Sequence, residues 1–174
     1  EAISFMASFA CTFALVESGR YQNIGKAVGS ICNDELCHAE GDKRILKHLL
    51  ADPDYRSIFD EERDEFVNII NNVVKQELRF ADYIFEEGRK VLGLTSNLLK
   101  EYVAFIATPV YDTLEIDYPV AILGDKPQSN PCSYMDKYID RDMMQTANQE
   151  ITNNNYRVGQ VVNDMSDVEF DVDF

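Results

Sequence analysis

The stretch NDELCH at residues 33–38 brings two carboxylates, a thiol and an imidazole together within a few positions. Around it, residues 24–50 repeat apolar side chains at three- and four-residue steps, which is the period of an amphipathic helix. In such a helix Glu35 and His38 leave from one face, because they are three residues apart. Glu-x-x-His is how four-helix carboxylate proteins present ligands to a pair of metal ions. On its own, Glu-x-x-His is common by chance. The simpler interpretation is therefore that Glu35 and His38 lie on a solvent-exposed helix face.

The rest of the chain favours an all-α fold. Four apolar-periodic segments predict helices, over residues 1–16, 24–50, 60–89 and 98–107. Pro53 is expected to stop the second helix, and the fourth is expected to end before Pro109. A short amphipathic piece is expected within residues 133–144. No strand pattern is evident, so we predict long antiparallel helices.

The character of the chain changes towards its end. Residues 146–174 are polar and then acidic, and the last fourteen hold five acidic residues and no basic one. We therefore predict two parts, a helical region over 1–145 and a disordered acidic tail over 146–174.

The formal net charge of −15 argues against nucleic acid and anionic membranes as partners, because both would repel the chain. Four cysteines without a C-x-x-C pair are interpreted as reduced thiols. The longest apolar run, residues 5–16, is too short to span a bilayer, and no signal peptide is evident. We expect a cytoplasmic protein, in the host cytoplasm if a phage encodes it.

A second carboxylate strengthens the metal interpretation. Glu1 precedes Glu35 by 34 residues with a turn between them, so on two antiparallel helices the two would lie at the same level. Glu followed by Glu-x-x-His is half of the di-metal carboxylate pattern. Phe5 and Phe9 are expected on the face of Glu1, and Val28 and Ile31 on the face of Glu35. An apolar pocket beside the metals is therefore predicted, although these four can also be simple core residues.

Other polar residues near the motif receive weaker interpretations. Asp34 lies four residues before His38 and is suited to orient its imidazole, or is an ordinary exposed residue. Cys37 is left out as a ligand because carboxylate-rich metal sites disfavour thiolate. His48 is expected at the surface, and Glu77 is expected to make a hydrogen bond rather than ligate.

In these residues, the chain resembles the C-terminal half of the small (β) subunit of class I ribonucleotide reductase. The resemblance rests on ordered blocks that span nearly the whole chain. They are EAISFMASFACTFALVES, NDELCHAEG, QELRFADYIFEEG, SNPCSYMDKYI and QEITNNNYRVGQVV with its acidic end in Phe. It implies a ferritin-like helical bundle, of which this chain is one half.

The resemblance also implies roles for individual residues. Glu1, Glu35 and His38 match ligands of a di-iron centre, for which manganese is an alternative. Phe5, Phe9, Val28 and Ile31 match the pocket that protects a tyrosyl radical. Asp34, Glu150 and Tyr156 match the radical-transfer route to the large (α) subunit. The last residues, including Phe170 and Phe174, match the peptide that docks on that subunit.

The other metal ligands and the radical-bearing tyrosine of the family lie upstream of the matched region. We therefore expect an N-terminal half of the β subunit as a partner, a homodimer of the complete subunit, and no activity from this chain alone. Two alternatives remain open. One is a non-catalytic assembly and docking module, and the other is a stand-alone ferritin-like metal protein with a site between two copies.

Overall fold

The computed structural model describes residues 2–139, so Glu1 and residues 140–174 lie outside the described part. The chain divides into two units, and every element below belongs to the first, Glu1–Arg141. The predicted boundary at residue 146 falls outside the described residues. The elements are α1 (Met6–Glu17), α2 (Gln22–Leu50), α3 (Pro53–Glu61), α4 (Arg63–Phe85), η1 (Glu86–Gly88), α5 (Ser96–Leu114), α6 (Val120–Leu123), η2 (Ser133–Met135) and α7 (Asp136–Ile139). The described residues contain helices and no strand, which confirms the all-α prediction.

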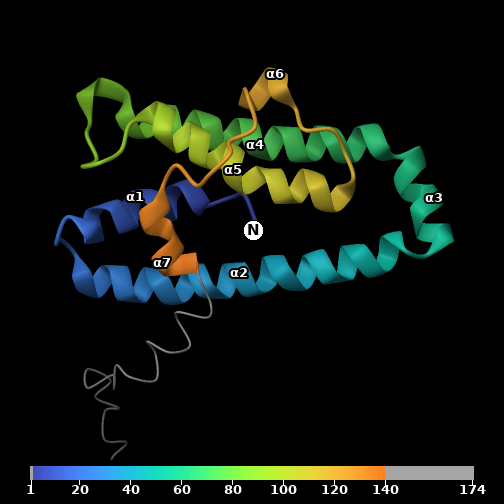
Figure 1. The fold of residues 1–174 in the computed structure, drawn as a ribbon, viewed down its shortest axis with the longest axis horizontal. Helices are drawn as coiled ribbons and strands as arrows, with labels where there is room; N and C mark the ends of the chain where they lie inside the picture. The colour runs from blue at the N-terminus through green and yellow to red at the C-terminus, as the bar shows by residue number, and fades with distance from the viewer. Residues whose placement is uncertain (1, 140–174) are drawn as a thin grey trace, which may run out of the picture. The chain divides into compact units, whose positions relative to one another are not determined.

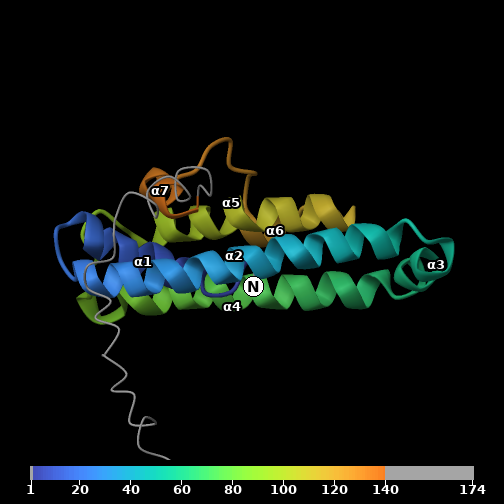
Figure 2. The ribbon, with the colours of Figure 1, turned by 90° about the horizontal axis from the view of Figure 1, so that it is seen from below.

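Three long helices frame the first unit. Helices α4 and α5 form one closely packed pair, and α2 lies opposite them, with α3 linking α2 to α4 at one end (Figure 1). The short helix α1 lies between α2 and this pair, beside the first half of α2. Seen from below, α4 and α5 lie on either side of α2 (Figure 2). No helix in the described residues is long and apolar enough to cross a membrane.

Helix α1 forms the centre of the core because it is apolar on all sides. Eight of its twelve residues are buried, and it contacts α2, α4, α5 and η2. The segment after α6 closes over it. The Tyr134 hydroxyl donates a hydrogen bond to the Ala10 carbonyl at 2.8 Å, and the Tyr138 ring stacks on Phe13 with 3.8 Å between centroids. The four cysteines form no disulfide.

Helix α1 begins at Met6, so the prediction of a helix from residue 1 is wrong. Phe5 has a left-handed backbone, with φ of 68°, and stands just before the helix. The partly buried carboxylate of Glu77 on α4 lies near the backbone N–H groups of Phe5 and Ala7, which favour its charged form and so lower its pKa. Because helix N–H groups at a first turn lack partners within the helix, this carboxylate stabilises the start of α1 at this position.

The prediction that the second helix stops before Pro53 is confirmed, since α2 ends at Leu50, but Pro53 has a further role and Pro109 differs from the prediction. Pro53 begins α3, because Asp52 caps that helix by accepting a hydrogen bond from the Asp54 N–H at 2.9 Å. Pro109 lies inside α5, which continues to Leu114. Proline removes one hydrogen bond and costs about 3 kcal/mol in a helix interior. Burial of Ala107, Tyr111 and Leu114 on both sides of it offsets this cost.

Helix α4 ends at Phe85, four residues earlier than predicted. Glu87 and Gly88 both have positive φ, at 55° and 74°, which ends the regular helix. The Arg89 guanidinium donates hydrogen bonds to the carbonyls of Tyr83 and Ile84. These carbonyls belong to the last turn, where regular helical hydrogen bonds end, and the Tyr83 carbonyl also accepts from the Glu86 N–H.

The contact between α1 and α2 depends on Gly25. A Cβ atom at this position would lie 2.4 Å from Cγ2 of the buried Val16, whereas a Cβ at Gly29 would meet nothing within 4 Å. We predict that Gly25→Ala lowers the free energy of unfolding by about 1–3 kcal/mol. Gly29→Ala, one turn later in the same helix, should raise it by about 0.5–1 kcal/mol. Chemical unfolding of both variants checks this, and equal effects would contradict the close packing.

Burial raises the pKa of Glu77 above its ordinary value of 4.5, although the N–H groups of Phe5 and Ala7 oppose the shift. The folded state therefore binds this proton more tightly than the unfolded state does. Stability from this group is present below pH 4.5 and is lost as pH rises through the folded-state pKa. We predict that wild type loses stability relative to Glu77→Gln between pH 4 and pH 7.

Urea unfolding of wild type and Glu77→Gln across this pH range tests the direction in which their stability difference changes. Glu65→Gln, which changes an exposed carboxylate of the same helix, is the matched control. A stability difference that grows in favour of wild type with rising pH would contradict the burial of Glu77.

Candidate metal centre

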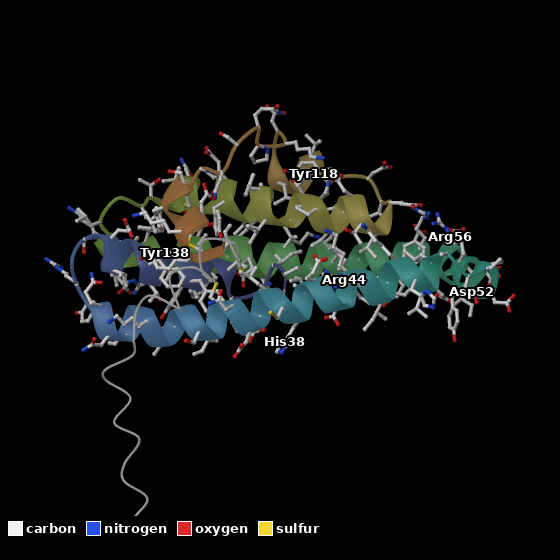
Figure 3. The ribbon with its side chains drawn as sticks, turned by 60° about the horizontal axis from the view of Figure 1, so that its bottom comes forward. His38, Arg44, Asp52, Arg56, Tyr118 and Tyr138 are labelled. Carbon is white, nitrogen blue, oxygen red and sulfur yellow. The ribbon has the colours of Figure 1, made fainter. Side chains whose placement is uncertain are left out.

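Glu35 and His38 lie one turn apart on α2, as the sequence predicts. Nδ1 of His38 is 3.7 Å from Oε2 of Glu35, and their side chains are 57% and 24% exposed, respectively. Figure 3 shows His38 on the side of α2 that is turned away from α4 and α5. The pair is therefore presented on an open helix face rather than inside the core.

The two side chains suit a hard or borderline cation. Carboxylate and imidazole are both ligands of Fe²⁺ and Mn²⁺. Two donors on one ion, with bonds of about 2.1 Å, lie roughly 3 Å apart, so a small side-chain rotation brings this pair to ligating distance. Among residues 2–139, no third His, Cys, Asp or Glu joins them. The pair thus fits part of a metal site, and further ligands have to come from elsewhere.

The buried thiols of Cys32 and Cys11 do not join this pair in a cluster of three possible ligands within residues 2–139. Burial, together with the charge of Glu35, raises the pKa of the Cys32 thiol to about 11. Burial and nearby Cys132 raise the pKa of Cys11 to about 11 as well. Both thiols stay protonated near neutral pH, whereas a metal binds the thiolate. Asp34 lies on the exposed side of α2, where its acidic group is accessible to a partner.

The four residues predicted to line a dry pocket divide into two groups. Phe9 is buried, and Val28 packs against the core. Phe5 and Ile31 are 59% and 52% exposed, respectively. Phe5 also lies outside α1, so the argument that placed it on one helical face with Glu1 is wrong. These four residues do not enclose a pocket in the described chain, and their pocket role stays a prediction.

Glu77 of α4 has a role at the start of α1 that the sequence did not reveal. The backbone N–H groups of Phe5 and Ala7, at the start of α1, favour its charged form, and the expectation that it makes hydrogen bonds stays a prediction. Its Oε2 is buried without a hydrogen-bond partner among the described atoms. The signal in the sequence was an acidic residue within the apolar stripe of α4. The sequence does not reveal that Glu77 lies near Phe5, because the two residues are far apart in the chain.

The remaining predicted site residues lie outside the described part. They are Glu1, Glu150, Tyr156, Phe170 and Phe174. Their predicted roles as ligand, radical-transfer residues and docking residues therefore stay predictions.

Comparisons with known proteins agree with this pattern. The family model described as "Ribonucleotide reductase, small chain" matches residues 1–120. Ribonucleoside-diphosphate reductase subunit beta of Buchnera aphidicola subsp. Acyrthosiphon pisum is 32% identical over 173 residues, covering 98% of this chain and 44% of that protein. Subunit beta of the Salmonella typhimurium reductase 1 is 31% identical, covering 99% of this chain and 44% of that protein. Subunit beta of phage T4 is 29% identical, with 96% and 43% covered.

The chain thus spans less than half the length of these relatives. The family match includes α2 with Glu35 and His38 and extends to the end of α5. The all-helical, ferritin-like fold agrees with it. Since the match covers well over half of the sequence, the chain belongs to the ribonucleotide reductase small chain family.

Proposed function

We propose that this chain is the C-terminal part of a ribonucleoside-diphosphate reductase β subunit and contributes half of a di-iron site. The observation that carries the proposal is the Glu35–His38 pair, with Nδ1 and Oε2 3.7 Å apart, within the family-matched region. The relatives align along nearly the whole chain, so the acidic end is part of the likeness as well.

In the proposed site, Glu35 and Glu1 supply carboxylate oxygens and His38 supplies an imidazole nitrogen. When bound, a di-iron centre reduces dioxygen and furnishes the oxidising equivalent that the enzyme uses. The exposed face of α2 requires a cover. A covered site excludes water, which strengthens electrostatic interactions and prevents side reactions of reactive groups. In the proposal, the remaining part of the β subunit provides this cover, together with the other ligands.

Asp34 and the tail then connect the centre to the large subunit. In the proposal, Asp34 accepts a hydrogen bond beside the metal ligands and so orients a neighbouring donor. The Tyr156 phenol gives up an electron and its O–H proton in the transfer, with Glu150 nearby in sequence as a proton-accepting group. Phe170 and Phe174, spaced in an acidic segment, suit binding of a short peptide in a groove of the partner.

The metal role predicts a selective effect of His38→Ala. In a β subunit that contains this chain, continuous or assembled from two chains, the variant should bind iron at least about 100-fold more weakly. This exceeds the 10–100-fold loss typical of removing an outer hydrogen bond. His48→Ala changes the other histidine of α2, ten residues later and exposed, and should leave iron binding unchanged. Iron titration with colorimetric counting measures both.

The same titration separates the alternatives. Equal iron binding in the His38→Ala and His48→Ala variants would reject the metal role of His38 and favour a docking module. Tight iron binding by the isolated chain that depends on His38 would favour a stand-alone protein with a site between copies.

The proposed radical-transfer role of Tyr156 predicts a loss of ribonucleotide reduction without a loss of iron. Tyr156→Phe should lower ribonucleotide reduction by about 100-fold or more, since phenylalanine has no O–H to release. Iron content and affinity for the large subunit should stay at wild-type values. Tyr55→Phe, an exposed tyrosine of α3, is the control.

Deleting residues 161–174 should instead remove binding to the large subunit while iron content stays unchanged. Full turnover by the Tyr156→Phe variant would contradict the transfer role. Undiminished binding by the shortened chain would contradict the docking role.

A further inference from the structure

Residues 132–139 form a short strap that closes over α1. The strap consists of Cys132, η2 and α7, and it contacts α1 through η2 and α2 through α7 (Figure 1). Its side chains Cys132 and Met135 are 1% and 0% exposed, respectively. The strap therefore contributes to the core, although more than a hundred residues separate it from α1 in the sequence.

One carboxylate holds the far end of the strap. Glu17, the last residue of α1, accepts hydrogen bonds from Lys137 Nζ at 2.5 Å and from the Tyr138 hydroxyl at 3.0 Å. Beside them the Tyr138 ring stacks on Phe13 of α1, with 7° between the ring planes. The side chains of Lys137 and Glu17 are 58% and 34% exposed, respectively. Because water competes for exposed ion pairs, this attachment is weak enough to break while the helices stay folded.

Under the strap lies a phenol without a hydrogen bond. Tyr102 of α5 is fully buried, and its hydroxyl has no hydrogen-bond partner among the described residues. Burial raises the pKa of Tyr102, and nearby Cys132 and Asp136 of the strap raise it further. A buried donor without a partner destabilises the closed arrangement, since the same hydroxyl would have water as a partner if it were exposed.

We propose that the strap is a conformational device that opens and closes over Tyr102 as one unit, with Glu17 as its latch. The hydrogen bonds to Glu17 and the stack of Tyr138 on Phe13 favour the closed state. The Tyr102 hydroxyl favours the open state, in which water reaches it. Opening therefore requires less free energy than unfolding of the whole helical unit. In the open state the thiol of Cys132 becomes accessible.

The alkylation rate of Cys132 measures opening, because this residue is 1% exposed when the strap is closed. The full chain would be treated with N-ethylmaleimide, and labelling of each cysteine would be counted by mass spectrometry. Cys37 is exposed and serves as the reference in the same sample. Glu17→Gln should raise the rate at Cys132 relative to Cys37 by at least about 3-fold, because it weakens the latch.

Asp60→Asn is the matched control. Asp60 accepts hydrogen bonds from Arg56 Nε at 3.2 Å and from Arg63 Nη2 at 3.0 Å, so it too joins one carboxylate to two donors. It belongs to α3, at the opposite end of α2 from α7 (Figure 1). The ratio of the two labelling rates should stay within about 2-fold of wild type, since distant sites act independently.

Tyr102→Phe should act in the opposite direction to Glu17→Gln. The variant removes the unpaired hydroxyl and keeps the ring, so the closed state should gain stability and the rate at Cys132 should fall by at least about 3-fold. Urea unfolding of the same proteins gives the fraction that is globally unfolded. In wild type, Cys132 should react at least about 10-fold faster than this fraction allows, because the strap opens on its own.

Three outcomes would overturn the proposal. Equal labelling ratios in wild type and Glu17→Gln would show that Glu17 is no latch. A faster rate at Cys132 in Tyr102→Phe would show that the phenol stabilises the closed strap. A wild-type rate that matches the globally unfolded fraction would show that the strap does not open by itself. None of these measurements uses metal or the large subunit, so they succeed or fail independently of the proposed function.

Discussion

The burial of α1 is the constraint on which the rest of the structure depends. A helix that is apolar all round is stable only when other elements surround it. Helix α2 approaches it closely at Gly25, α4 and α5 cover a second side, and Tyr134 and Tyr138 close a third. These contacts set the rotation and height of α2. They thereby determine which of its faces is buried and which carries Glu35 and His38.

The same packing explains why the candidate site is open. On α2, Gly25, which packs against Val16 of α1, and Cys32 are buried. The adjoining face presents His38 and Ile31 to solvent, although isoleucine at helical spacing is typical of a packed interface. Glu35 and His38, which no third possible ligand joins among residues 2–139, and the exposed Ile31 agree with the proposal that another part of a larger subunit packs on this face. The lengths of the relatives agree with that interpretation.

The helical repeat of the sequence was sufficient to predict the fold class and part of the candidate site. The all-α fold and the shared face of Glu35 and His38 follow from the helical repeat alone. Pro53 follows the end of α2, as predicted, but the start of α3 there was missed, because Asp52 followed by proline is also a helix start. Pro109 was misread because the buried residues on both sides of it outweigh a lost hydrogen bond. The start of α1 at Met6 depends on Glu77, a tertiary contact that local sequence does not reveal. The exposure of Phe5 and Ile31 depends on how the helices pack, which local sequence does not reveal.

Counting tightly bound iron on the chain by itself tests the central claim most directly. The purified chain would be loaded with Fe(II) without oxygen, exposed to air, and compared with the same chain supplied with the remaining part of the β subunit. The account predicts little tightly held iron on the isolated chain and a stable iron pair in the completed subunit. A stable iron pair on the isolated chain would contradict it, because Glu35, His38 and Glu1 would then form a site without the rest of the subunit.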